Sequence, residues 1–550
     1  MPVGIEFLLT PYNLTMVEKN KYAISRKDAI KRLGSLTLSL PFAPSVISRL
    51  SSNAPGTESA PAILKRRQPA IKGKPNILWI TTEGVPVNAL SCYGSYLTRT
   101  PNIDRLAKEG LLFRNSFCNN ALCAPSRATL LTGKYNHLNG MLSNYYTASN
   151  GQPASTFEAH QQNFARILKN NGYNTAIAGK WHLPANPGEV GFDRYIYKKG
   201  AGGPYYKAGG YFQNEEFGST KTVEREHPGY GTDNFTNITI EWMKDLQQRN
   251  KPFLMTLQFF NDHRPFDPPH KYEHIYDHQR FPEPGTFWDN YETRSSAARI
   301  AHMSIEDMKD FNPPSDLSPR QRKQWNYQAF MRHFFGTLKS QDDNMGRILD
   351  FLDQSGLSDN TIVVYTGDHG FYLGDHGWFD KRFMYEQALR VPWMIRYPGV
   401  TKPGSETDAW VLSIDNAPTV LDMAGISIPA DMQGRSLMPV FQGKTPSDWR
   451  KSMYYHYYEF QAPHWVLPHY GIRTERFKLI SYYTINEWEM FDLQKDPDEM
   501  DNLMIEAGYK VREGYEDVLQ KLLKELEDLR KQYKDDTGLP VNFRPVRAYN

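Results

Sequence analysis

The sequence contains few cysteines: Cys92, Cys118 and Cys123 are the three among its 550 residues. Such a small and odd number excludes a disulfide framework as the basis of the fold, although one pair could form. No apolar run reaches the length of about 18 residues that a membrane-spanning helix needs. Neither charge is in excess, since 64 Lys+Arg face 61 Asp+Glu. This balance argues against a protein that binds nucleic acid or a membrane surface.

The composition is that of a globular protein, with 40% hydrophobic and 13% aromatic residues. The length favours three or four domains, but large α/β enzymes often use one big sheet domain instead. Aromatic residues are frequent in carbohydrate-binding clefts, although packing is the simpler explanation for any single one.

Residues 1–50 have the order of an export signal, in which basic residues precede a short apolar run and then small residues. The stretch S-R-K-D-A-I-K-R-L-G resembles a twin-arginine leader with Lys27 in place of the second arginine, and a start at Met16 would give it a normal length. The alternative is a disordered N-terminal arm. Residues 51–73 are rich in Ser, Pro, Ala and Lys and predict a linker. We therefore expect an exported protein, periplasmic or secreted.

Strands alternate with helices from residue 74 onward. Apolar, β-branched runs predict buried strands at 77–82, 173–179, 252–260 and 361–367. Helical patterns with capping signals lie between them, at 100–110, 156–172, 235–249 and 324–356. This order predicts an α/β fold, with a large, mostly parallel sheet sandwiched by helices over residues 74–445.

Residues 446–550 differ in character and predict a smaller C-terminal α+β subdomain. Short runs such as S-M-Y-Y-H-Y-Y-E-F indicate a small antiparallel sheet with polar turns. A terminal helix is expected near 514–534, where one stripe carries Val518, Leu519, Leu522, Leu526 and Leu529.

Polar, reactive residues follow four of the predicted strands. Glu83 follows the first, Lys180 and His182 the second, His263 the third and Asp368 the fourth. In such sheets ligands bind beyond the carboxyl ends of the strands. The pattern therefore predicts an active site at that edge.

The string C-A-P-S-R-A-T-L-L-T-G-K at 123–134 resembles the sulfatase signature Cys-x-Pro-Ser-Arg-x-x-x-Leu-Thr-Gly. Further segments that resemble sulfatases follow in the family's order, among them A-G-K-W-H-L and T-G-D-H-G-F-Y-L-G-D-H-G-W-F-D-K, and together they span about residues 74–535. The resemblance implies a formylglycine-dependent sulfatase with an alkaline-phosphatase-like fold. The alternative is a buried structural cysteine at a helix start.

The resemblance implies that a maturation enzyme converts Cys123 to Cα-formylglycine. The hydrated aldehyde offers two hydroxyls on one carbon: one attacks sulfur, and deprotonation of the other then expels sulfate. Arg127 would steady the hydrate. Lys180 and His182 match a family pair that binds sulfate and acts as base, and His263 and Lys381 match residues at the ester. Which of His263 and Lys381 is the general acid stays open, and a loop histidine and a solvated lysine are the simpler alternatives.

The family also implies a divalent cation, Ca²⁺ or alternatively Mg²⁺, because oxygen ligands favour these hard ions. The expected ligands are Glu83, Cys123 after its conversion, Asp368 and His369. The family usually has a second carboxylate after Glu83, but here Gly84 stands in that place. The site loses a ligand unless water, Asn88 or bidentate Glu83 compensates.

Three further histidines are candidates for substrate binding: His376, His464 and His469. His376 is equally open to a structural role, and the other two would have to overhang the cleft from the small subdomain. The paired Asp342 and Asp343 lie within a predicted helix, which favours a polar face or a buried anchor over catalysis.

The combined interpretation is an exported sulfatase that acts on a sulfated saccharide, a glycosaminoglycan or algal polysaccharide fragment. Its partners would be that saccharide and the maturation enzyme, with neither nucleic acid nor a membrane span. Two alternatives stay open. One is a phosphonate monoester or phosphodiester hydrolase of the same superfamily, and the other is a non-catalytic protein that binds sulfated glycans, which Gly84 supports.

Overall fold

The computed structural model describes residues 73–147, 153–198, 205–206, 209–260, 263–460, 462–506 and 508–538. The predicted leader at 1–50 and the predicted linker at 51–73, apart from Gly73, lie outside the described residues. Within the described part of the chain, no helix combines the length and the apolar character needed to cross a membrane.

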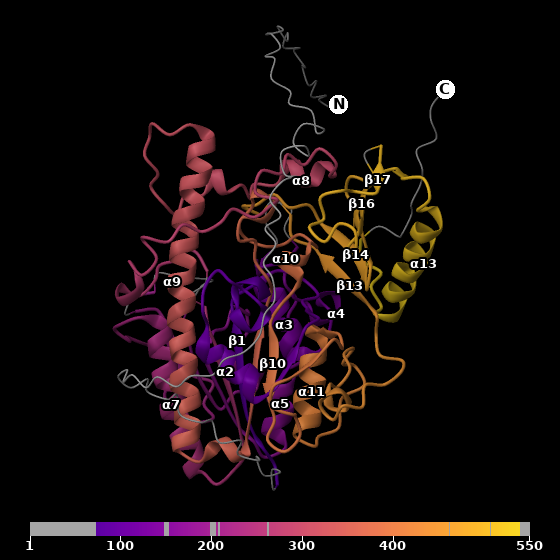
Figure 1. Cartoon of the computed structure of the whole chain (residues 1–550). Helices are drawn as coiled ribbons and strands as arrows, with labels where there is room; N and C mark the ends of the chain where they lie inside the picture. The colour runs from indigo at the N-terminus through magenta and orange to yellow at the C-terminus, as the bar shows by residue number, and fades with distance from the viewer. Residues whose placement is uncertain are drawn as a thin grey trace, which may run out of the picture. The chain divides into compact units, whose positions relative to one another are not determined.

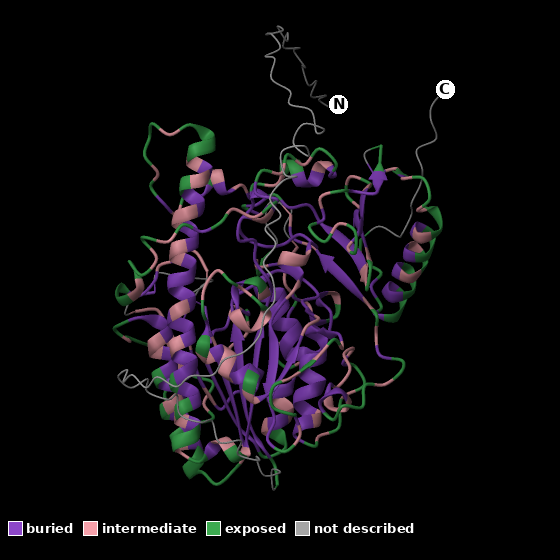
Figure 2. Ribbon diagram, viewed as in Figure 1, coloured by how far each residue is buried: buried purple, intermediate pink, exposed green. Residues whose placement is uncertain are grey.

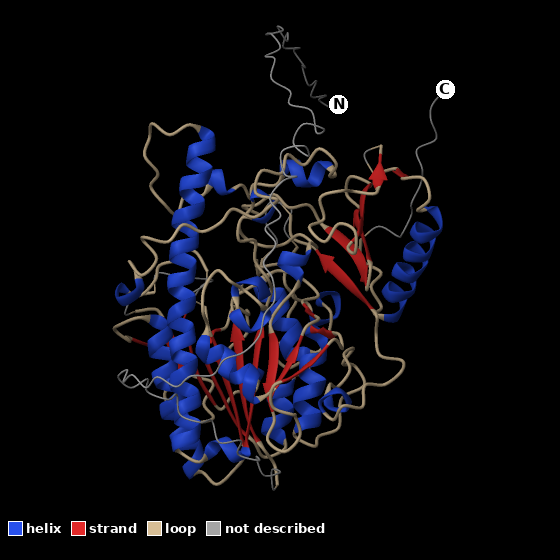
Figure 3. Cartoon of the chain, viewed as in Figure 1, coloured by secondary structure: helices blue, strands red, loops and turns tan. Residues whose placement is uncertain are grey.

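A ten-stranded mixed sheet forms the centre of the fold (Figure 3). Its order is β11 (Ser405–Thr407), β2 (Leu111–Phe113), β10 (Trp393–Arg396), β9 (Thr361–Gly367), β1 (Asn76–Thr82), β8 (Phe253–Gln258), β4 (Asn174–Lys180), β5 (Arg194–Lys198), β6 (Tyr211–Asn214) and β7 (Thr222–Arg225). The five strands from β9 to β5 are parallel, and β10, β6 and β7 pair antiparallel with their neighbours. The predicted mostly parallel sheet is confirmed.

Helices cover both faces of this sheet (Figure 1). On β1, Leu78 and Ile80 pack into one core with α2 (Pro101–Glu109), α7 (Gly231–Gln248) and α9 (Pro319–Gln354). Ile77 and Trp79 point to the other face and pack with α3 (Cys123–Thr132), α5 (Phe164–Asn170), α11 (Asn416–Met423) and α12 (Met438–Phe441). Because both faces are covered, the central strands are buried (Figure 2).

Two predicted helices differ from the expected ones. The pattern over 156–172 yields a helix only at Phe164–Asn170, where the Asn163 side chain accepts from the backbone N–H of Arg166 and caps the start. The stretch 324–356 belongs to one long helix, α9, which begins at a capping box formed by Ser318 and Gln321.

Asp342 on α9 is the buried anchor that the sequence favoured. Its Oδ1 accepts from the backbone N–H groups of Asn102 and Ile103, each at 2.9 Å. These belong to the first turn of α2, whose N–H groups have no partner within the helix, so the carboxylate satisfies them and ties α2 to α9.

The C-terminal part forms the predicted antiparallel sheet, with β13 (Ser452–Tyr457), β14 (His469–Thr474), β15 (Phe477–Tyr482) and β16 (Glu487–Asp492). Helix α13 (Glu516–Gln532) buries the predicted leucine stripe, and Val518 is half-buried. The same core includes Phe117, Leu389 and Leu412 of the preceding part, so this subdomain packs directly on it. The domain boundary at 445/446 stays a prediction.

The remaining elements are short. They are β3 (Ser116–Phe117) paired with β12 (Val411–Leu412), β17 (Met504–Ile505) paired with β18 (Lys510–Val511), and the helices α4 (Asn136–Asn139), α6 (Pro187–Val190), α8 (Ser296–Ile300) and α10 (Glu386–Leu389).

Candidate active site

Cys123 is the first residue of α3, and its side chain is buried. Its Sγ lies 2.9 Å from Glu83 Oε1 and 3.4 Å from His369 Nε2. The extended backbone of Leu122 leads into the helix, and Gly133, with a φ of 67°, ends it. Arg127 lies one helical turn after Cys123, so its guanidinium reaches the carboxylate of Glu83, which also contacts Cys123.

Three central strands end in the charged groups around Cys123. Glu83 follows β1, Lys180 ends β4 and Asp368 follows β9. Glu83 Oε1 lies 2.8 Å from Lys180 Nζ, while Arg127 Nη2 bridges Glu83 Oε2 at 2.8 Å and Asp368 Oδ2 at 3.0 Å. The parallel sheet therefore brings together residues that are far apart in the sequence, as the strand-end pattern predicted.

Glu83, Cys123, Asp368 and His369 form a cluster that could hold a metal ion, since one ligand atom of each lies within 4.8 Å of all the others. His369 Nδ1 donates to the carbonyl of Gly370 at 2.8 Å, which leaves Nε2 to face the cluster. Asp368 Oδ2 accepts no hydrogen bond from the described residues, although Arg127 is close to it. Two buried carboxylates and an imidazole suit a divalent cation.

The backbone at Gly84 is unfavourable for the carboxylate-bearing residue that the family resemblance implied there. Its φ is +60°, and an added Cβ would lie 3.1 Å from a ring carbon of Phe371 and 3.4 Å from Cε1 of His369. Its backbone N–H instead donates to Asp368 Oδ1 at 3.2 Å. Asn88 is exposed and lines a surface groove with Asp375, so the expectation that it could complete the cluster is wrong.

The surrounding charges shift the pKa values of the cluster. Burial and Glu83 raise the pKa of Cys123, but Lys180, Lys381 and His369 outweigh them and hold it well below the ordinary thiol value. Burial raises the pKa of Glu83 as well, yet Lys180 and its other cationic neighbours keep it well below the usual carboxyl value. Burial and the charge of Glu83 raise the pKa of Asp368 to about 7. Asp368 is therefore the carboxylate that the neighbouring cations stabilise least, and a bound cation would favour its ionised form.

Two histidines, His182 after β4 and His263 after β8, also lie next to Cys123. His182, at a left-handed φ of 53°, and His263 have pKa values lowered chiefly by burial, while hydrogen bonding to Cys123 acts in the opposite direction. His263 Nδ1 donates to the carbonyl of Arg264 at 3.2 Å, which leaves Nε2 for the contact with Cys123. Both side chains can therefore accept a proton near neutral pH.

Lys381 lies in a buried polar group with Asp380 and His464. Asp380 Oδ2 is 3.5 Å from Lys381 Nζ and 3.3 Å from His464 Nε2. Burial lowers the pKa of Lys381, but the negative charges of Asp380 and Cys123 raise it by more. The net shift is upward, so the amine stays charged. The small subdomain therefore reaches the Asp380–Lys381 pair through His464.

His376 and His469 lie in aromatic packing. His376 Nδ1 is 3.1 Å from Asp289 Oδ2, and its ring packs against Trp378. His469 Nδ1 donates to the carbonyl of Leu467 at 2.7 Å and its ring stacks on Tyr455. Both side chains are fully buried, and these contacts favour a structural role; their contact with substrate stays a prediction.

Three polar residues of the site were not singled out from the sequence. Gln258 ends β8 and accepts from Arg127 at 2.8 Å, so the strand-end pattern could have indicated it. Asp380 stands next to Lys381. The side-chain oxygen of Asn144 accepts from the backbone N–H of Ala124 at 3.0 Å, and the backbone N–H of Asn144 donates to Glu459. No local sequence pattern indicates either hydrogen bond.

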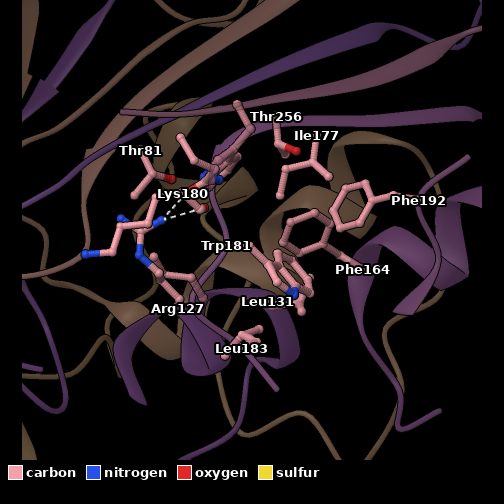
Figure 4. Close-up of a pocket in the computed structure, with 13 residues that line it drawn as sticks. Thr81, Arg127, Leu131, Phe164, Ile177, Lys180, Trp181, Leu183, Phe192 and Thr256 are labelled. Atoms are coloured by element: carbon pink, nitrogen blue, oxygen red, sulfur yellow. Dashed lines mark hydrogen bonds between the residues drawn. The ribbon is translucent and has the colours of Figure 1, made fainter. Parts of the chain in front are cut away.

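An apolar wall lies behind the charged groups (Figure 4). A cavity of about 30 Å³ separates Arg127 and Lys180 from the side chains of Leu131, Phe164, Trp181 and Phe192. A wall of this kind excludes water, so the charges in front of it interact more strongly than they would in solvent.

A family model described as "Sulfatase" matches residues 75–426, and one described as "N-sulphoglucosamine sulphohydrolase, C-terminal" matches residues 374–532. The chain belongs to the sulfatase family. It is 40% identical over 511 residues to an N-acetylglucosamine-6-O-sulfatase of Bacteroides thetaiotaomicron, covering 84% of this chain and 87% of that protein. It is 28% identical over 517 residues to an arylsulfatase of Clostridium perfringens, covering 85% and 98%.

Solved structures of sulfatases also resemble this chain. A sulfatase in complex with its substrate D-glucosamine-2-N,6-O-disulfate matches with a TM-score of 0.77 and 39% identity, covering 85% of this chain and 99% of that one. A phosphonate monoester hydrolase of Agrobacterium radiobacter matches with a TM-score of 0.63 and 21% identity, covering 84% and 96%. The latter likeness shows the fold alone and confirms the expected alkaline-phosphatase-like architecture.

Proposed function

We propose that this sulfatase hydrolyses sulfate esters of a sulfated saccharide at Cys123, after a maturation enzyme has converted that residue to Cα-formylglycine. The arrangement around Cys123 carries the proposal: Arg127, Lys180 and Lys381 supply positive charge, and the imidazoles of His182 and His263 can take up or give a proton. A dianionic sulfate in the transition state needs cations, and a hydroxyl nucleophile needs a base.

The formylglycine hydrate would supply the nucleophilic hydroxyl and, on the same carbon, a second hydroxyl whose deprotonation releases sulfate. In the unmodified chain Sγ of Cys123 stands in the place of the hydroxyl oxygen. Glu83 Oε1, 2.9 Å from Sγ, orients this position and Arg127 fixes Glu83 in turn.

Other residues of the chain bind the sulfate group and transfer the protons. Lys180 and Lys381 bind the sulfate oxygens, and His182 takes the proton of the second hydroxyl. His263 Nε2 and Lys381 Nζ both face the leaving oxygen, and one of them protonates it. We propose that Glu83, Asp368 and His369, together with residue 123 after its conversion, would hold Ca²⁺ or Mg²⁺; the ion would polarise the ester and favour the ionised nucleophile.

We propose a 6-O-sulfated glucosamine residue of a glycosaminoglycan fragment as the substrate. The support is the likeness to the N-acetylglucosamine-6-O-sulfatase and to the sulfatase bound to glucosamine disulfate. His464, which reaches the Asp380–Lys381 pair, would contact the sugar. An exported, periplasmic or secreted location agrees with a polysaccharide substrate and with the leader predicted at 1–50.

The test is sulfate release from N-acetylglucosamine-6-sulfate by protein made with its maturation enzyme, with Cys123→Ala as the control. Release by the unchanged protein and none by the variant would support the proposal. A preference for phosphate diesters over sulfate esters would favour the phosphodiesterase alternative. Absence of both ester cleavage and metal binding would favour the non-catalytic glycan-binding alternative.

A further inference from the structure

Trp465 is an exposed tryptophan in a strained backbone conformation. Its side chain is 43% exposed and its φ is +51°, in the left-handed region that residues other than glycine, asparagine and aspartate rarely adopt. Strain of this kind persists where the surrounding structure imposes it, and it is concentrated at functional sites. The indole also meets the ring of Phe460 edge-on, with centroids 6.2 Å apart.

The surroundings hold Trp465 firmly. The backbone N–H of His302 donates to the carbonyl of His464 at 2.8 Å, and His464 Nδ1 donates back to the carbonyl of His302 at 2.9 Å. The His302 ring stacks on the indole, with centroids 5.3 Å apart and planes at 29°. These two hydrogen bonds join the loop at His302 to the loop at His464. The stacked His302 ring covers one face of the Trp465 indole, and we call this pair of rings the aromatic platform.

The platform continues outward from the catalytic lysine. The exposed fraction rises from 2% at Lys381 and 3% at Asp380 to 6% at His464 and 43% at Trp465. Lys381 contacts Asp380, and Asp380 contacts His464, the residue before Trp465. A saccharide whose sulfate lies against Lys381 would place its first ring at Asp380 and His464 and the following ring at Trp465.

We propose that the indole of Trp465, backed by His302, is a subsite that stacks against the pyranose ring next to the sulfated sugar. The apolar C–H face of a pyranose packs on an aromatic ring, and the indole N–H, which has no hydrogen-bond partner among the described residues, can donate to a sugar hydroxyl. The inference rests on the proposed function, because it takes a sulfated saccharide as the ligand.

The experiment compares the matured enzyme with its Trp465→Ala and Trp465→Phe variants on two substrates. One is 6-O-sulfated N-acetylglucosamine, and the other is a disaccharide with that sugar at its non-reducing end. Trp465→Ala should lower kcat/KM for the disaccharide about tenfold, mainly through KM, as the loss of one aromatic stacking contact predicts. It should leave the monosaccharide nearly unchanged, and Trp465→Phe should restore most of the loss because it keeps a ring.

Trp325→Ala is the matched control, since Trp325 is 37% exposed on α9. It should affect neither substrate. An unchanged disaccharide rate in Trp465→Ala, or an equal loss on both substrates, would overturn the subsite.

Calorimetric binding of the disaccharide to Cys123→Ala protein, with and without Trp465→Ala, separates this inference from the proposed function. If the unchanged enzyme releases no sulfate, the proposed function fails while the titration still tests the subsite. Weaker binding by about tenfold in the double variant supports it. Equal binding, or none to either protein, overturns it.

Discussion

Glu83→Gln tests the role assigned to the cluster most sharply, because it removes one charge and keeps the shape. Glu83 contacts Cys123 Sγ, Lys180 Nζ and Arg127 Nη2 at 2.9, 2.8 and 2.8 Å. A glutamine oxygen can still accept a hydrogen bond from the cations. The substitution therefore isolates the negative charge that a metal ion needs from the packing that the fold needs.

Glu83→Gln should reduce the stability of the fold modestly and the affinity for the metal ion strongly. Breaking a buried ion pair usually costs about 3–5 kcal/mol of unfolding free energy, because a charge is left without a partner. Here Arg127 keeps Asp368 at 3.0 Å, and the repulsion between Glu83 and Asp368 disappears, so we expect about 1–3 kcal/mol. Loss of a metal-bound carboxylate should exceed the roughly 10–100-fold loss in affinity typical of outer-shell changes. Since Gly84 already lacks a ligand atom, the cluster cannot compensate.

The assay measures metal affinity by calorimetry, sulfate release at saturating metal and thermal unfolding on the same preparations. Turnover should fall by at least about 100-fold, as the loss of electrostatic stabilisation at a reacting centre predicts. Glu109→Gln is the control, since Glu109 on α2 pairs with Arg105 of the same helix and with Arg396, the last residue of β10. If Glu83→Gln binds the ion as tightly as the unchanged protein and keeps its turnover, the assigned cluster is wrong.

Other perturbations test the remaining roles. Cys123→Ala should abolish sulfate release while the thermal midpoint stays nearly unchanged, and retained turnover would contradict covalent catalysis. Cys123→Ser should accumulate a sulfated serine, visible by intact-mass spectrometry, because serine has one hydroxyl and cannot expel sulfate by forming a carbonyl. Removal of the general acid should slow the hydrolysis of sugar sulfates, which have a poor leaving group, far more than that of aryl sulfates. Measuring Lys381→Ala and His263→Ala on both kinds of substrate identifies the general acid. A variant that loses equal activity on sugar and aryl sulfates would have no proton-donor role at the replaced residue. Chelation of divalent ions should abolish activity, and adding back Ca²⁺ or Mg²⁺ separately should show which ion restores it; full activity in chelator would exclude a catalytic metal.

The sheet and much of the candidate site follow from local patterns. Apolar β-branched runs define buried strands, and the carboxyl ends of parallel strands necessarily meet at one edge. Glu83, Lys180 and Asp368 could therefore be placed together before any coordinates were known. The missing carboxylate at Gly84 could be seen only through the resemblance to sulfatases, which implies a carboxylate at that position.

Contacts between distant loops could not be predicted in this way. The pairing of Asp380 with His464 depends on how the small subdomain docks, and the packing of His376 and His469 depends on aromatic neighbours from several segments. Asn88 follows Glu83 closely in the sequence, yet its turn carries it to the surface. Helical periodicity over 156–172 likewise did not show that the helix begins only at Phe164.

The central claim is that residue 123 acts as an aldehyde hydrate. Peptide mass spectrometry of active protein, made with its maturation enzyme and quantified alongside sulfate release, tests it most directly. We expect the specific activity of each preparation to rise in proportion to the fraction of peptide that carries formylglycine at position 123. Full activity in protein whose Cys123 is entirely an unmodified thiol would contradict it.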